Sequence, residues 1–169
     1  MRLLRFFTKS KGVALQYPLA PTPRIAVLDD RFAACGPVSI LNEESAKTEL
    51  DRRSIETVAA SPARLIRLIA LDWRPVYPLI ALTSPNYLLG EYDRDLLWRA
   101  FEVPVYEQVV DAQGRLLASE CEAHDGLHVE FDTELRWPEM TRVEGLCGCG
   151  KPGSRLLPVP QSLALRATA

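Results

Sequence analysis

Short apolar runs alternate with helix-forming segments through the middle of the chain. Runs with the length and β-branched content of strands occur at Arg24 to Leu28 (RIAVL), Val76 to Thr83 (VYPLIALT) and Val103 to Val110 (VPVYEQVV). After Ser61-Pro62 and again after Ser84-Pro85, apolar residues recur at helical spacing. A capping residue followed by Pro is typical of a helix start, so the pattern predicts helices that end at Pro75 and near Glu102.

The segment before the helix start at Ser61-Pro62 is polar and charged. Asn42 to Ala60 reads as a solvated helix that could break near Ser54, with Asn42 as its N-cap and an opposite-charge pair between Lys47 and Asp51. Residues 13–23 contain three prolines and should be extended and irregular.

The third quarter of the chain changes from helices to hairpins. Asp111 to Gly114 (DAQG) has the length of a hairpin turn after the strand candidate at Val103 to Val110. Arg115 to Glu120 is the returning strand, and Leu127 to Phe131 is a further strand candidate. Alternating helices and strands predict a single small α/β domain that ends in a β-hairpin and a zinc-stabilised Cys/His loop region. We place a basic, Pro-containing arm at residues 1–23, the domain at 24–153 with its metal-binding end at 121–150, and a tail, or a strap laid on the domain, at 154–169.

Composition narrows the class of protein without naming a reaction. The chain has 169 residues, 47% of them hydrophobic and 25% charged, which fits a globular domain and excludes a collagen-like or wholly disordered chain. The net charge of -2 gives no general electrostatic case for nucleic acid. No run of about 18 uncharged apolar residues occurs, so we expect no transmembrane segment.

The charges of the N-terminal segment are all positive. Arg2, Arg5, Lys9, Lys11 and Arg24 all precede the first acidic residue, Asp29. Such an arm could pack on the domain, contact a membrane surface or an acidic partner, or act in targeting.

Candidate chemistry concentrates in one short stretch. Cys121, His124, His128, Cys147 and Cys149 include both histidines and three of the four cysteines, in the spacing C-x2-H-x3-H-x18-C-x-C. Tetrahedral zinc takes four such ligands, in structural sites as two pairs from two loops. We favour Cys121, His128, Cys147 and Cys149, with His124 as the competing ligand.

Other interpretations of this stretch stay open. The C-x-C pair could be a disulfide or two free thiols, the metal could be catalytic, or Cys121 could be a nucleophile with a histidine base oriented by Asp125. We expect Arg115, Arg142 or Lys151 to balance the thiolate charge, and Cys35, among small apolar neighbours, to be a buried thiol. The acidic residues around the cysteines could supply a general base or a hard-metal site: Glu120, Glu122, Asp125, Glu130 and Asp132.

The segment Ser119 to Val129 (SECEAHDGLHV), with VPVYEQ before it and CGCGKPGSRL after it, resembles the phenylacetate–CoA ligase-like branch of the adenylate-forming enzymes. The likeness covers about residues 62–156, and Leu79 to Val105 is similar to that family's strand–helix–strand passage. The resemblance implies that Cys121, one histidine of this segment, Cys147 and Cys149 correspond to a structural zinc site found in some members.

The chain also departs from that family. Its phosphate loop is absent, and the aromatic-Gly-x-Ser/Thr-Glu motif expected after Tyr106 is replaced by EQVVDAQG. The 18 residues between His128 and Cys147 are too few for the ribose-binding Asp segment, and the domain with the catalytic Lys has no counterpart. ATP binding and acyl-adenylate formation therefore do not carry over.

These observations favour a zinc-binding accessory or binding protein, non-catalytic and a reduced relative of acyl- or aryl-CoA ligases, with a protein partner. One alternative is a subunit of an acyl- or aryl-acid-activating enzyme whose partner chain binds the nucleotide, with an acyl or CoA-type ligand by resemblance alone. Another is a peripheral membrane or acidic-partner adaptor that uses the basic arm. Cysteines in a metal-like arrangement without a signal peptide favour the cytoplasm.

Overall fold

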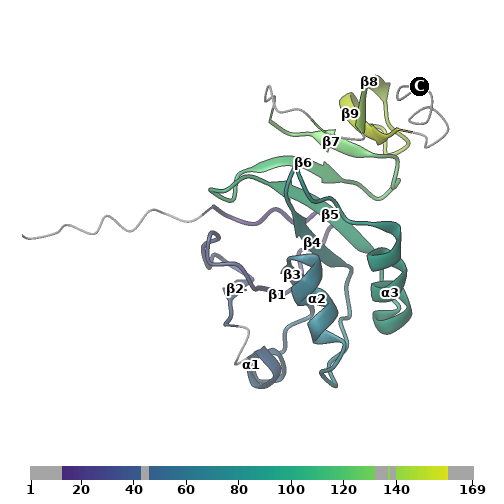
Figure 1. The fold of residues 1–169 in the computed structure, drawn as a ribbon. Coiled ribbons are helices and arrows are strands. Elements are labelled where there is room, and N and C mark those ends of the chain that lie inside the picture. Colours follow the sequence, from purple (N-terminus) through teal and green to yellow (C-terminus); the bar gives the residue numbers. More distant parts are fainter. Residues whose placement is uncertain (1–12, 43–45, 132–136, 138–139, 160–169) are drawn as a thin grey trace, which may run out of the picture.

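The computed structural model describes residues 13–42, 46–131, 137 and 140–159. In these residues one mixed sheet of nine strands carries three helices, with the strand order β2-β1-β3-β4-β5-β6-β7-β9-β8 (Figure 1). The strands are β1 (Ile25–Val27), β2 (Val38–Ile40), β3 (Thr57–Ala60), β4 (Leu79–Thr83), β5 (Val105–Val110), β6 (Leu116–Glu120), β7 (Leu127–Val129), β8 (Met140–Leu146) and β9 (Pro152–Pro158). The helices are α1 (Ala46–Arg52), α2 (Pro62–Leu68) and α3 (Glu91–Phe101).

The sheet has a parallel half and an antiparallel half. Strands β2, β1, β3, β4 and β5 are parallel, whereas β6, β7, β9 and β8 add to β5 in antiparallel pairs. Strand residues that alternate along the parallel half pack in two layers. Ala26, Val58 and Ala81 join the core beneath the helices, and Val27 and Ile80 join the opposite layer, against Leu15 and Tyr17 of the N-terminal segment. The molecule is a small α/β domain, as the sequence predicts.

Several predicted elements are confirmed. The strand candidates around Ile25, Leu79, Val105 and Leu116 all form, and Ser61 is the N-cap of α2 with Pro62 at its first position. The turn between β5 and β6 closes through hydrogen bonds between Asp111 and both Gly114 and Arg115.

The helix predicted for Asn42 to Ala60 is wrong in its second half. Helix α1 ends at Arg52, Ser54 adopts a left-handed φ of 50°, and Thr57–Ala60 form β3, in the middle of the parallel half of the sheet. All four strand residues are buried between β1 and β4, and this burial outweighs the helix propensity of two alanines. The expected N-cap Asn42 precedes residues 43–45, which lie outside the described residues.

Three further expectations need correction. Ser84-Pro85 opens a turn closed by reciprocal backbone hydrogen bonds between Ser84 and Tyr87, and α3 starts only after its N-cap Gly90. Cys35 is exposed, because it lies in the loop between β1 and β2. Residues expected to begin the tail form β9, which pairs with β7 and β8. The remainder of the tail, 160–169, and residues 1–12 of the basic arm lie outside the described residues.

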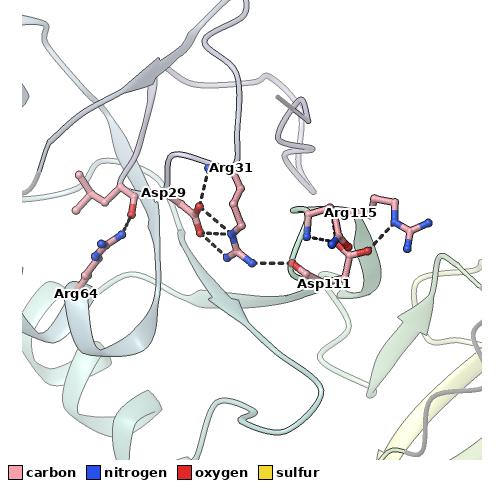
Figure 2. Close-up of polar contacts among 7 residues, drawn as sticks. Asp29, Arg31, Arg64, Asp111 and Arg115 are labelled. Atoms are coloured by element: carbon pink, nitrogen blue, oxygen red, sulfur yellow. Dashed lines mark hydrogen bonds and ion pairs between the residues drawn. The ribbon is translucent and has the colours of Figure 1, made fainter. Parts of the chain in front are cut away.

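Arg31 joins the loop after β1 to the β5–β6 turn. Figure 2 shows its guanidinium donating hydrogen bonds to both carboxylate oxygens of Asp29 and to the backbone oxygen of Asp111, the last at 2.6 Å. Asp111 in turn holds Arg115, with Nε 2.6 Å from Oδ2. Arg64 of α2 donates to the Leu28 carbonyl on the other side of Asp29. These contacts fix the carboxyl end of β1, while the candidate cysteine and histidine ligands lie at the antiparallel end of the sheet.

None of the helices in the described residues combines the length and the apolar character that crossing a bilayer requires.

Candidate metal centre

Four of the five candidate ligands converge at the antiparallel end of the sheet. The ligand atoms of Cys121, His128, Cys147 and Cys149 all lie within 4.8 Å of one another. The Cys121 and Cys147 sulfurs are 3.6 Å apart, and the Cys149 sulfur is 3.4 Å from His128 Nε2. Tetrahedral zinc would separate two sulfurs by about 3.8 Å and a sulfur from a nitrogen by about 3.5 Å, given its bond lengths. The four side chains are close enough to bind a metal ion.

Neighbouring strands and two loops bring these residues together. Cys121 follows directly on β6, His128 is the central residue of β7, and the Cys147–Cys149 pair follows β8. The pairing of Ser119 with His128 fixes β7 against β6 and so turns the imidazole toward the cysteines. Cys121, His128 and Cys147 are buried, and Cys149 is half-buried.

The fifth candidate, His124, points elsewhere. Its Nδ1 lies 2.7 Å from Glu120 Oε1, and its ring stacks on Tyr106 with the ring centroids 4.9 Å apart. His124 has a left-handed φ of 48°, because the chain turns sharply after Cys121 through a hydrogen bond from the His124 amide to the Cys121 carbonyl. The geometry therefore selects His128 for the cluster.

Glycines shape both loops. Gly126 has a φ of 78°, and a Cβ there would lie 2.5 Å from the Leu156 carbonyl oxygen, so only glycine fits between the loop and β9. A Cβ at Gly148 would meet Ala123 at 3.2 Å, which places the C-x-C loop directly against the 121–126 loop. The second loop is closed by hydrogen bonds from the Cys147 amide to the Lys151 carbonyl and from the Gly150 amide to the Cys147 carbonyl.

Arg155 is the cation beside the cluster. It pairs in register with His128, is 8% exposed, and forms an ion pair with Asp125 through Nη1. Its Nε is buried and has no hydrogen-bond partner among the described residues. Two of the expected cations have other partners, since Arg115 pairs with Asp111 and Arg142 Nε donates to the Ser154 hydroxyl. The expectation for Lys151, whose side chain is exposed, stays a prediction.

The thiols differ in their environment. Burial and the neighbouring Cys149 and Cys147 sulfurs raise the pKa of the Cys121 thiol to about 11. The backbone amide of Cys149 lowers the pKa of the Cys147 thiol, and the charge of Arg155 acts in the same direction. Ionising several neighbouring thiols in a buried cluster is unfavourable unless a cation is present.

The geometry disfavours the competing interpretations of these residues. Cys147 and Cys149 are free thiols and not a disulfide. A Cys–His–Asp chain does not form, because His124 Nδ1 faces Glu120 and Asp125 faces Arg155. The acidic residues do not share one environment: Glu120 is buried, Glu122, Asp125 and Glu130 are exposed, and Asp132 lies outside the described residues.

Sequence reasoning missed Arg155 and Gly126. The Asp-Gly pair at residues 125–126 is a turn signal that could have drawn attention to Gly126. Arg155 carries no such signal, because only the pairing of β9 with β7 brings it beside His128.

Comparison with protein-family models finds no match to this chain. A search of curated proteins likewise finds no match.

Proposed function

We propose that Cys121, His128, Cys147 and Cys149 bind one zinc ion that acts as a folding staple in a non-catalytic binding or accessory protein. The convergence of four ligand atoms within 4.8 Å carries this proposal. All four ligands come from the chain, so the tetrahedron would be closed, as it is in structural zinc sites. A catalytic zinc would keep one position open for water or substrate.

The donor set suits zinc. Three thiolates and one imidazole are soft and borderline ligands in a tetrahedral arrangement, which suits zinc and does not suit magnesium or calcium. In a reducing compartment such a set stays available for metal, and this supports the cytoplasm as its location.

Charge balance at the cluster supports the same assignment. Zinc with three thiolates and a neutral imidazole would carry a net charge of about -1. The buried Arg155 guanidinium supplies the opposite charge. Arg155 is paired with His128 across β9 and β7, and its Nε has no hydrogen-bond partner among the described residues. Because Asp125 holds the other end of the guanidinium, Arg155 is fixed in place as an outer-shell partner.

A zinc staple is useful at this end of the sheet. The core formed with β6, β7 and β9 is small, with Val109, Ala118, Leu127 and Leu156 as its buried apolar members. Metal binding here would tie the ends of β6 and β8 to β7, and metal-binding free energy would add to folding free energy.

The kinship with CoA ligases is proposed on the same residues. Three of the four converging residues lie in the ECE and C-x-C segments that carry the resemblance, and the fourth is the histidine of DGLH. The stretch that should carry the nucleotide motif instead enters the β5–β6 turn, which supports a reduced, non-catalytic relative.

The test compares two cysteine substitutions. Cys147→Ser should lower the melting temperature and the zinc content together, whereas Cys35→Ser, at an exposed cysteine outside the cluster, should change neither. Equal melting of Cys147→Ser and the unaltered chain, with and without chelator, would refute the staple. Measuring melting with added ATP or CoA distinguishes the acyl-activating alternative, since a nucleotide or CoA site would raise the melting temperature.

A further inference from the structure

An open cleft lies beside the metal cluster and takes no part in it. The cleft has a volume of about 1160 Å³ and runs between α3 and the loop that follows β6. The 85–91 segment and α3 form one wall, and His124, Gly126, Met140 and Pro158 form the other. None of the four candidate metal ligands lines it.

Two buried carboxylates form the floor of the cleft. Glu107 of β5 and Glu120 of β6 are 4% and 7% exposed. Glu107 Oε1 accepts hydrogen bonds from the Thr83 hydroxyl at 2.7 Å and the Leu89 amide at 2.8 Å. Burial raises the pKa of Glu107, while these hydrogen bonds and the charge of Arg94 oppose that rise. A carboxylate held in this way is fixed in position before any ligand arrives.

Arg94 is committed to the protein's own groups. Its Nη1 lies 3.2 Å from Glu120 Oε2 and donates to the Val105 carbonyl at 2.7 Å. Glu120 Oε2 also accepts the Glu107 amide at 2.9 Å, and its other oxygen faces His124. The charge of one arginine therefore stands against two carboxylates on the floor of the cleft. Glu91 and Asp95 of α3 add two more acidic side chains to the lining.

The walls of the cleft are aromatic and apolar. Tyr87 and Trp98 line it and are 58% and 53% exposed, and Leu88, Leu127 and Met140 lie with them. Exposed aromatic rings inside a cleft are suited to an organic body, and their faces also attract cations. Arg94 within the lining and the apolar walls disfavour a bare divalent metal ion.

We propose that this cleft binds a small organic cation, an ammonium or guanidinium group carried on an apolar body. The cation meets Glu107, with the charge of Glu120 beside it, and the body lies against Trp98 and Tyr87. Anions such as carboxylates, nucleotides and CoA meet an acidic lining whose one arginine is already paired. This inference goes beyond the zinc staple. Glu120 and His124 lie on either side of Cys121 in the sequence, so a bound metal would hold this wall of the cleft in place.

The test uses three probes that share a phenyl ring and differ in charge: 2-phenylethylamine, 2-phenylethanol and phenylacetate. Titration of the metal-loaded chain, followed by calorimetry, should show the amine binding at least about tenfold more tightly than the alcohol, with no phenylacetate binding. Equal binding of all three, preference for phenylacetate, or no binding of the amine would overturn the proposal. The proposal would also be overturned if a lysine-rich peptide bound but 2-phenylethylamine did not.

Matched variants locate the binding. Trp98→Ala should weaken amine binding about tenfold, whereas Tyr92→Ala, at an α3 aromatic that is 78% exposed and lies outside the cleft lining, should not. Glu107→Gln removes the charge that binds the amine while it keeps the shape of the side chain. If Glu107→Gln does not fold, Asp95→Asn removes a charge from the cleft lining instead. Equal effects of Trp98→Ala and Tyr92→Ala would contradict the site.

Metal content is measured on the same samples. A chain that retains zinc but binds no amine refutes the cleft alone. A chain that binds the amine without ever holding zinc refutes the staple alone.

Discussion

His124 Nδ1 faces Glu120 Oε1 at 2.7 Å, although His124 is only three residues from Cys121. The nearer histidine is thereby removed from the cluster, and His128, seven residues from Cys121, enters it. The two histidines of the chain therefore make a matched pair for mutation.

His128→Asn should reduce zinc affinity by more than about 100-fold, because it removes a ligand, whereas His124→Asn should retain the metal. Competition with a chromophoric chelator measures both affinities. Zinc loss in His124→Asn with retention in His128→Asn would reverse the assignment of the ligand.

Arg155→Gln should weaken zinc binding about 10- to 100-fold, because the thiolate charge would lose its buried counter-charge. The zinc affinity of Arg155→Lys should lie between those of Arg155→Gln and the unaltered chain. Lysine keeps the charge but not the planar guanidinium that contacts Asp125 through Nη1 and Leu146 through Nη2. Arg142→Gln, on the exposed strand β8, is the control. Equal chelator competition for Arg155→Gln and the unaltered chain would show that the arginine has only a packing role.

Gly126→Ala should lower the free energy of unfolding by about 3 kcal/mol, because its Cβ would clash with the Leu156 carbonyl. Gly36→Ala shares the positive φ but has open space around it, so it should cost only about 1 kcal/mol. Urea unfolding of both variants isolates the clash. Equal losses would mean that the loop can move away from β9.

Asp29 provides a prediction about pH. Burial tends to raise its pKa, but the hydrogen bonds and charge of Arg31 outweigh this and lower it below the ordinary value of 3.8. A carboxyl whose pKa falls on folding stabilises the folded chain above that ordinary value and loses the contribution as pH falls through the folded-state value.

Asp29→Asn should therefore reduce the free energy of unfolding by about 1 kcal/mol at neutral pH, discounted for partial exposure. The difference from the unaltered chain should shrink below pH 3.8. Denaturant unfolding at matched metal load measures it. A difference that grows on acidification would contradict the ion pair.

Local patterns predicted the elements that form from adjacent residues. The Ser61-Pro62 start of α2 and the Asp111 turn depend on such residues, and both form as expected. Strand β3 could not be recognised, because Thr57–Ala60 is short and half alanine, and its strand state depends on pairing with β1 and β4. Strand β9 is rich in Pro and Gly, and its pairing with β8 over seven residues is a tertiary feature.

The residue types of the candidate site were predictable from sequence. The C-x-C spacing and the nearby histidines identified the ligand set and favoured His128, whereas excluding His124 required its contacts with Glu120 and Tyr106. The buried carboxylates of the cleft lie within strands, and no spacing marks Glu107 of VYEQVV as a site residue.

Metal stoichiometry tests the central claim most directly. The purified chain should be assayed by elemental mass spectrometry, with thiols titrated before and after chelation. We expect one zinc per chain, with the exposed Cys35 reacting first and the other three cysteines reacting only once zinc is removed. A chain without metal, whose thiol reactivity is unchanged by chelator, would contradict the zinc staple.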